Sequence, residues 1–361
     1  MALKAALQNF SRTVFTLLLA LAAAWVCVLT RTPLPWVIGP LIATGVLSML
    51  GAPTRSYTPL RNGGQWVIGT ALGLYFTPQV VALVASLWWA IALNIVWALA
   101  LGFGFGAWLY RVHFPPGRMH LKGLTRTTTY FAAPIGAASE MTLLGERHGA
   151  QTELVASSHS LRALLVTLII PFGLQWAGLQ GLDTTPPGPR VVDWPGLGLL
   201  AVLTGMGCWV MLLLKRTNPW FIGALAVAVL LTANGVNLSA IPQWLTNAAQ
   251  LVIGISLGVR FTRQFVHLAP RWLASIALAT VVMIALCAGF AWLLAHATGQ
   301  YWTTVMLGTS PGGIAEMAIT AKVLQLGVAL VTALHVTRLA AVLLLVEPLY
   351  RWVYADRADA A

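Results

Sequence analysis

The chain has 361 residues, of which 58% are apolar and only 8% are charged. An ordinary soluble domain carries roughly 25% charged residues, so this composition cannot cover a globule with polar surface and excludes the soluble class. The formal net charge of +12 comes from basic residues in short loops, as the positive-inside rule expects. We therefore predict an all-α polytopic membrane protein. No loop is long enough for a DNA-binding domain, so we expect no direct nucleic-acid partner.

Several apolar stretches are close to or longer than the roughly 20 residues that a membrane-spanning helix needs. In chain order they cover residues 14–29, 80–109, 155–174, 197–214, 276–294 and 326–345. We expect the stretch near 79–110 to form one long span. The chain is therefore expected to contact the lipid bilayer along most of its length.

The first half of the chain is repeated in the second half. The segment Pro35-Trp-Val-Ile-Gly39 returns as Pro219-Trp-Phe-Ile-Gly223, and the pattern Gln-x-Val-Ile-Gly-x-x-Leu-Gly occurs at 65–73 and again at 250–258. Such self-similarity indicates an internal duplication. We predict a first membrane repeat over residues 1–178, a Pro-containing linker over 179–195 and a second repeat over 196–361, packed into one membrane body. The paired glycines of the second pattern favour close helix contact over ligand binding.

Loop charges predict that the two repeats have opposite orientations. Arg55 and Arg61 occupy a loop of the first repeat whose counterpart, residues 233–247, has no charge, and the next pair of loops shows the reverse. This pattern is typical of inverted-topology repeats in secondary transporters. Inversion requires an odd number of crossings per repeat. We therefore expect about five full spans each plus one Pro/Gly-broken or re-entrant segment, with both termini in the cytoplasm of a bacterial cell and the protein in the inner membrane.

The broken segment of each repeat carries the candidate site. Residues 133–141 end in Glu140-Met141, residues 309–317 end in Glu316-Met317, and a His-x-x-Arg motif follows each glutamate by 19 residues. Charged groups at membrane depth are costly unless paired, so they are functional candidates by default. The predicted solute- or ion-binding residues are Glu140, Glu316, His159, Arg162, His335, Arg338, Gly136, Gly312 and Gly313. The structural alternative is a buried Glu–Arg pair that clamps each broken segment to the next helix.

Signatures of enzymes are absent from the sequence. It contains no phosphate-binding loop, nucleophile elbow, HExxH motif or His-Cys cluster at metal-ligand spacing. Two glutamates and two histidines could be drawn as a dimetal site, but the adjacent arginines would repel a cation. We therefore predict no enzymatic activity, no metal and no cofactor.

The duplicated Pro-Trp-x-Ile-Gly, Gln-x-Val-Ile-Gly-x-x-Leu-Gly, Gly-x-x-x-Glu-Met and His-x-x-Arg patterns resemble the AbrB family of bacterial integral membrane proteins, which differs from the small soluble DNA-binding regulator of similar name. The resemblance covers nearly the whole chain. It implies a membrane AbrB duplication and a description as a regulator of gene expression or as an ammonia monooxygenase. It also implies a distant similarity to the cation-proton antiporter and anion transporter superfamily. Those antiporters commonly use paired aspartates, whereas no aspartate lies in a predicted span here, which argues against cation-proton antiport.

These observations lead to two functional hypotheses. The first is a secondary transporter that moves a small organic or anionic solute through a site between the repeats, coupled to a proton or a cation and compatible with a homodimer. In it the arginines attract a carboxylate, and a glutamate or histidine carries the coupling proton. The second is a membrane-embedded regulator of gene expression that acts through a partner or a solute without binding DNA itself.

Overall fold

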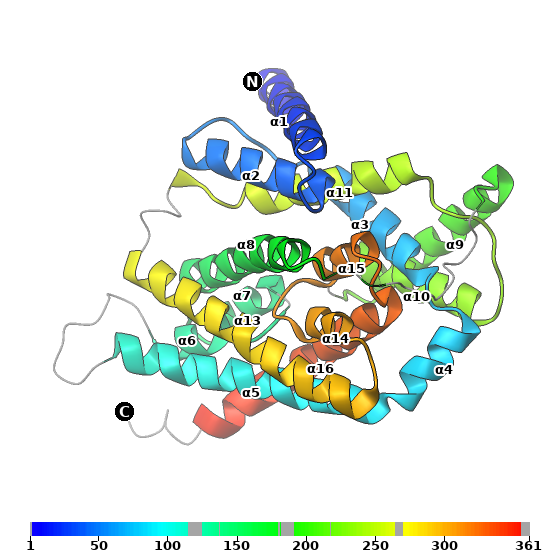
Figure 1. The fold of residues 1–361 in the computed structure, drawn as a ribbon. Helices are drawn as coiled ribbons and strands as arrows, with labels where there is room; N and C mark the ends of the chain where they lie inside the picture. Colours follow the sequence, from blue (N-terminus) through cyan, green and yellow to red (C-terminus); the bar gives the residue numbers. More distant parts are fainter. Residues whose placement is uncertain are drawn as a thin grey trace. The chain divides into compact units, whose positions relative to one another are not determined.

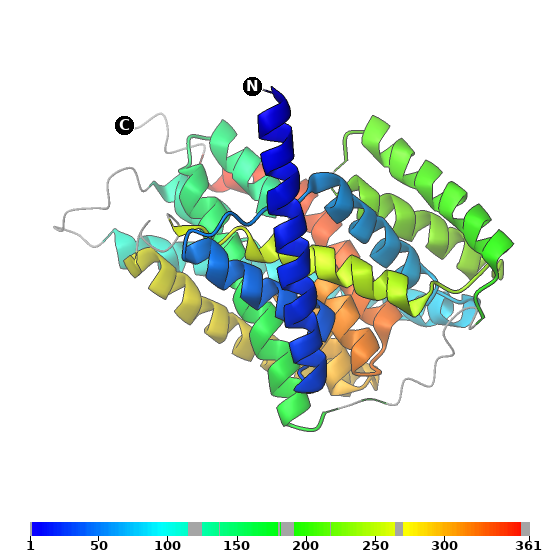
Figure 2. The same ribbon diagram turned by 90° about the horizontal axis from the view of Figure 1, so that it is seen from above.

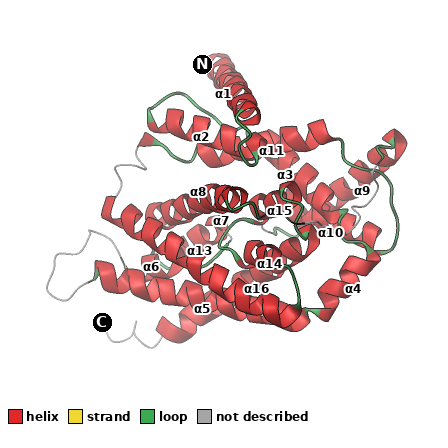
Figure 3. Cartoon of the chain, in the orientation of Figure 1, coloured by secondary structure: helices red, strands yellow, loops and turns green. Residues whose placement is uncertain are grey.

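The computed structural model describes residues 2–114, 125–136, 138–179, 181, 191–216, 218–263 and 270–354. These residues form 15 helices and, within those ranges, no strand (Figures 1 and 3). Most of the linker and the basic loop after residue 114 lie outside the described residues. The prediction of an all-α polytopic membrane protein is confirmed.

The helices of the first half are α1 (Ala2–Leu29), α2 (Pro35–Met49), α3 (Thr58–Gly73), α4 (Pro78–Ser86), α5 (Trp88–His113), α6 (Arg126–Ala132), α7 (Ala138–Arg147) and α8 (Thr152–Trp176). Those of the second half are α9 (Trp194–Leu213), α10 (Pro219–Ala233), α11 (Gln243–Gly258), α13 (Pro270–Thr298), α14 (Trp302–Thr309), α15 (Ile314–Val323) and α16 (Val328–Tyr354).

Six helices of the described residues are long and apolar enough to cross a bilayer, namely α1, α5, α8, α9, α13 and α16. Each of them contains most of one apolar stretch of the sequence. The prediction of a single span over residues 79–110 is wrong. The helix is interrupted at Leu87, between α4 and α5. Neither Pro nor Gly marks this interruption. Helix α4 follows α3 after a short break, and the two helices are bent by 85° relative to each other.

The two copies begin their second helix in the same unusual way. Leu34 precedes α2 with φ 49° and Asn218 precedes α10 with φ 49°, both in the left-handed region, and a proline follows each of them. Proline suits the first turn of a helix because its fixed φ is helical and its missing N–H would be unpaired there. A left-handed leucine is costly, so the surrounding structure must hold it in place.

The helices group into two compact units that do not follow the repeat boundary. Unit 1 comprises residues 1–85, 168–267 and 318–330, and unit 2 comprises residues 86–167, 268–317 and 331–361. Each unit therefore contains segments of both repeats. All nine predicted site residues fall in unit 2.

In unit 1 the repeats exchange equivalent contacts. Helix α2 packs against α11, and in the equivalent contact α10 packs against α3. Helix α1 lies on α2 and α11 (Figure 2), and α9 lies on α10 and α3. A Cβ atom at Gly69 would lie 2.5 Å from the Phe221 carbonyl oxygen, and one at Gly254 would lie 2.5 Å from that of Val37. Phe221 and Val37 occupy the same position of the Pro-Trp-x-Ile-Gly motif. The predicted role of these glycines in close helix contact is confirmed.

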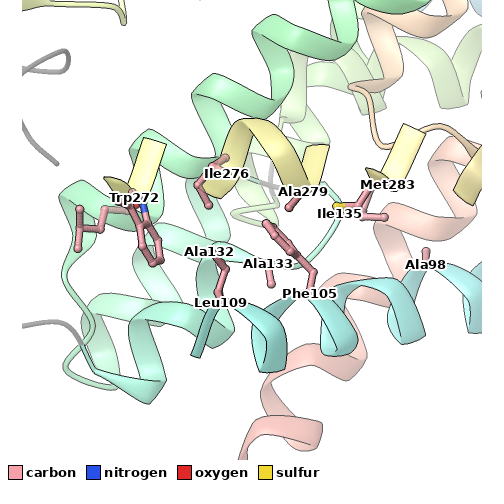
Figure 4. Packing of buried hydrophobic residues seen from close by; sticks show 11 residues of the cluster. Ala98, Phe105, Leu109, Ala132, Ala133, Ile135, Trp272, Ile276, Ala279 and Met283 are labelled. Carbon is pink, nitrogen blue, oxygen red and sulfur yellow. The ribbon is translucent and has the colours of Figure 1, made fainter. Parts of the chain in front are cut away.

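In unit 2 a buried apolar cluster joins α5, the end of α6, α8 and α13. Trp272 of α13 is fully buried and donates its indole N–H to the Leu154 carbonyl oxygen at 3.3 Å. Figure 4 shows the α13 side chains facing those of α5 and the segment after α6. The cluster consists of Ala98, Phe105, Leu109, Ala132, Ala133, Ile135, Leu154, Trp272, Ile276, Ala279 and Met283. This core supports the first broken segment.

Candidate functional site

The site is built from two interrupted helices in unit 2. Helix α6 ends at Ala132 and α7 starts at Ala138, and α14 ends at Thr309 and α15 starts at Ile314. Proline lies in each gap, at Pro134 and Pro311, where it removes a backbone donor and disfavours a helical residue before it. Gly136 adopts φ 111°, a conformation that only glycine takes readily.

An interrupted helix leaves its last carbonyl groups without N–H partners. In a bilayer no bulk water can satisfy them, so the protein must supply donors. The His-x-x-Arg motifs of α8 and α16 supply these donors in both copies. All four side chains are buried, with 4% or less of the surface of each exposed.

In the first copy, His159 and Arg162 hold the segment that follows α6. The histidine Nε2 lies 2.9 Å from the Phe131 carbonyl oxygen. Arg162 donates from Nη1 to the Ala133 oxygen at 2.9 Å and from Nη2 to the Pro134 oxygen at 2.6 Å. The motif therefore takes the place of the missing turn of helix.

In the second copy, His335 and Arg338 make the equivalent contacts. The histidine Nε2 lies 2.9 Å from the Leu307 carbonyl oxygen. Arg338 donates from Nη1 to the Ser310 oxygen at 2.6 Å and from Nη2 to the Gly312 oxygen at 3.0 Å. These acceptors lie one and two residues further along the repeat than in the first copy. The proline is also one residue later, so the point of interruption moves with it.

The hydrogen bonds define the tautomer of both histidines. Each Nε2 faces a carbonyl oxygen and must donate, whereas each Nδ1 faces an arginine Nη2, at 2.6 Å for His159 and 2.8 Å for His335, and must accept. A second ring proton would face a guanidinium N–H. Both imidazoles are therefore neutral in this arrangement, with both nitrogens engaged.

The sequence alternative of a Glu–Arg clamp is corrected by these contacts. A clamp is present in both copies, but its acceptors are backbone carbonyl oxygens. Among the described residues, neither Arg162 nor Arg338 forms a salt bridge with a carboxylate.

The two glutamates lie in the first turns of the helices that follow the interruptions, Glu140 in α7 and Glu316 in α15. A carboxylate is stabilised there because backbone N–H groups point toward it. The Glu316 carboxylate lies so close to Gly313 that a Cβ atom at Gly313 would collide with it. Glycine at this position therefore makes room for the carboxylate, and both residues belong to the predicted site.

The interruptions also meet the helix of the other repeat. A Cβ atom at Gly136 would lie 3.7 Å from Leu339 of α16, and one at Gly312 would lie 3.0 Å from Val166 of α8. Each break thus lies beside the helix that carries the opposite His-x-x-Arg motif. The structure places all nine predicted residues in unit 2.

Sequence reasoning missed two buried polar residues at the site. Asn94 of α5 is fully buried and donates from Nδ2 to the Leu334 carbonyl oxygen at 3.2 Å, next to His335. Ser158 donates to the Ala132 carbonyl oxygen at 2.9 Å and adds a donor at the end of α6. The only signal for Asn94 is an amide side chain inside an apolar span. In the part of the chain that the structure describes, no three His, Cys, Asp or Glu side chains gather as a metal site would require.

These features define an all-α multi-pass membrane protein organised around two interrupted helices, the plan on which many solute sites in membranes are built. The chain belongs to the AbrB family, because the family model described as "Transition state regulatory protein AbrB" matches residues 36–354.

Two relatives match along nearly their whole length. The chain is 27% identical to "Putative regulator AbrB" of Escherichia coli K12 over 91% of this chain and 93% of that protein. It is 23% identical to "Uncharacterized protein YhjN" of Bacillus subtilis 168 over 96% of this chain and 94% of that protein. No solved structure matches the chain.

Proposed function

We propose that this AbrB-family protein is a secondary transporter that moves a small organic or anionic solute through a site between its two repeats. The observation that carries the proposal is the presence of two interrupted helices in unit 2. Each has a glutamate in the helix after the break, and a buried arginine from another helix donates to carbonyl groups at the break. Half-helix termini of this kind bind solutes and ions near the bilayer midplane in several transporter folds.

The inverted relation of the repeats is part of this proposal. The exchange of α2–α11 and α3–α10 contacts is what a two-fold relation between the copies produces, and the alternating loop charges favour an axis in the membrane plane. With five full crossings and one interrupted segment per repeat, both termini lie in the cytoplasm of a bacterial cell whose inner membrane holds the protein.

The glutamates are the proposed carriers of a coupling proton. Both nitrogens of each site histidine are engaged by a carbonyl oxygen and an arginine, so a histidine would have to break the clamp in order to titrate. Glu140 and Glu316 can change charge without breaking it. Of the two residue types expected to carry the coupling proton, glutamate and histidine, we therefore propose glutamate.

The direct test is uptake by proteoliposomes containing the purified full-length protein, with radiolabelled succinate, propionate and phosphate as probes. Transport should be lost in Glu316→Gln and Glu140→Gln while folding is retained. Glu146→Gln changes an exposed carboxylate of the same helix as Glu140 and should leave transport unchanged. Equal transport by wild type and Glu316→Gln would remove Glu316 from the mechanism.

A second candidate function is membrane-embedded regulation of gene expression, which the name of the E. coli relative favours. On this proposal the protein acts through a partner or through the solute, without binding DNA. Transcript profiles of a deletion strain complemented with Glu316→Gln separate the two functions. A regulator that does not transport should still restore the profile.

Ammonia oxidation, by contrast, is not proposed. An enzyme of that kind should contain stoichiometric copper or iron after purification. Elemental analysis of the purified protein tests this directly, and a stoichiometric metal content would reverse our proposal that the protein is no enzyme and has no cofactor.

A further inference from the structure

We propose that the two interrupted helices of unit 2 form one binding site for a small organic carboxylate, shared between Arg162 and Arg338. The inference rests on the proposed transport function and narrows its solute from an organic or anionic molecule to a carboxylate held by both repeats. It also predicts that Glu316 opposes the binding of this anion instead of contributing a ligand to it.

The first argument is the uncompensated charge. Arg162 and Arg338 each expose only 2% of their surface, and neither forms a salt bridge among the described residues. A charge removed from water is strongly unfavourable unless an opposite charge joins it, and unit 2 holds two such charges. Backbone carbonyl oxygens solvate a guanidinium but do not neutralise it. A bound anion would supply the missing negative charge.

The second argument is the number of hydrogen-bond donors. A guanidinium carries five N–H donors in a planar fork. Each site arginine uses three of them, two on carbonyl oxygens and one on the histidine Nδ1. Among the described residues, two donors on each side chain have no acceptor, and an oxyanion offers the matching acceptors. The duplication provides this donor set twice, which favours a dicarboxylate over a monocarboxylate.

The third argument is the apolar surroundings of the breaks. Leu339 lies beside Gly136, Val166 lies beside Gly312, and Ile135 belongs to the buried apolar cluster of unit 2. Carbon atoms of a solute would find apolar contacts here, whereas a hydrated inorganic anion would lose its water without such compensation. The site therefore fits a carboxylate with a short carbon chain.

Glu316 would compete with this anion. Glu316 places a carboxylate beside Gly313, one residue from the carbonyl group that Arg338 holds. A second negative charge at the same break repels a bound carboxylate. Neutralising Glu316 by mutation should therefore tighten anion binding, although it should abolish coupled transport.

Calorimetric titration of the purified full-length protein with sodium succinate and sodium propionate, in a constant background of sodium chloride, tests the proposal. We expect one succinate per chain, bound more tightly than propionate. Arg162→Lys and Arg338→Lys should each weaken succinate binding about tenfold or more, because lysine cannot present the forked donors. Arg351→Lys, which alters an exposed arginine paired with Glu347 at 2.6 Å, should bind as wild type.

Glu316→Gln keeps the proposal testable even if the arginine variants do not fold. It should bind succinate several-fold more tightly than wild type, a gain that a damaged fold would not produce. Absence of saturable binding by both anions, equal binding by the arginine variants and wild type, or weaker binding by Glu316→Gln would each overturn the proposal. Transport of another solute without carboxylate binding would refute only the proposed carboxylate site. Carboxylate binding without transport of any solute would refute only the proposed transport function.

Discussion

Replacing Arg338 by lysine tests whether the His-x-x-Arg motif holds the interrupted helix. Lysine keeps the positive charge, although its ammonium group is more strongly hydrated than a guanidinium and therefore costs more to bury. It lacks the fork that reaches both the Ser310 oxygen at 2.6 Å and the Gly312 oxygen at 3.0 Å. At least one carbonyl group would therefore lose its donor.

The expected loss of stability follows from the hydrogen bonds. A bond between a charged donor and a neutral acceptor contributes about 1.5–3 kcal/mol, and an orphaned buried acceptor retains its own penalty. Losing one of the two contacts should therefore lower the free energy of unfolding by about 1.5–3 kcal/mol. Arg162→Lys should behave alike, because it loses one of two contacts with Ala133 and Pro134. The exposed control Arg351→Lys should change stability by about 0.3–0.5 kcal/mol.

The measurement is unfolding in detergent micelles, followed by the fluorescence of the 16 tryptophans. Hydrogen–deuterium exchange of residues 307–318 should rise in Arg338→Lys and stay unchanged in Arg351→Lys. Wild-type stability and wild-type exchange in Arg338→Lys would show that the carbonyl contacts do not hold the break. An equal increase in exchange over the whole protein would indicate general destabilisation and would also refute the reasoning.

Three further predictions address helix contact, the second break and the core of unit 2. Gly254→Ala should destabilise the protein by about 1–3 kcal/mol because its Cβ would meet the α2 backbone. Gly289→Ala, where a Cβ atom meets open space, should not; equal unfolding curves would contradict the close contact. Gly313→Ala should displace the Glu316 carboxylate and reduce proteoliposome transport without lowering the unfolding midpoint, and unchanged transport would count against that carboxylate. Trp272→Ala, at a fully buried position, should lower unfolding free energy by about 3–5 kcal/mol, and a loss below about 1 kcal/mol would mean that the cluster is not a core.

Composition and local pattern determined the membrane class, the helical secondary structure and the duplication. Apolar stretches of bilayer length have few alternatives to helices, because a backbone in lipid must satisfy its own hydrogen bonds. The same reasoning selected the candidate site residues. Placing an arginine or a glutamate inside an apolar span costs free energy, so such a residue in the sequence indicates a functional candidate.

Tertiary structure decided what those side chains contact. The sequence placed Arg162 and Arg338 near the glutamates, but their acceptors are carbonyl oxygens about 26–29 residues away in the chain. A carbonyl group is present at every residue and leaves no pattern. The break at Leu87, without Pro or Gly, is likewise invisible to local rules.

The grouping of helices into two units was also beyond the sequence. Duplication indicates which segments are equivalent, but it does not say that α2 pairs with α11 or that α5 and α13 share a core. Such pairings depend on shape and close approach between segments more than 150 residues apart, as at Gly254 and Val37. Burial, length and repetition are properties of a segment and can be read along the chain. Contacts between distant segments are properties of pairs, and only the folded structure specifies them.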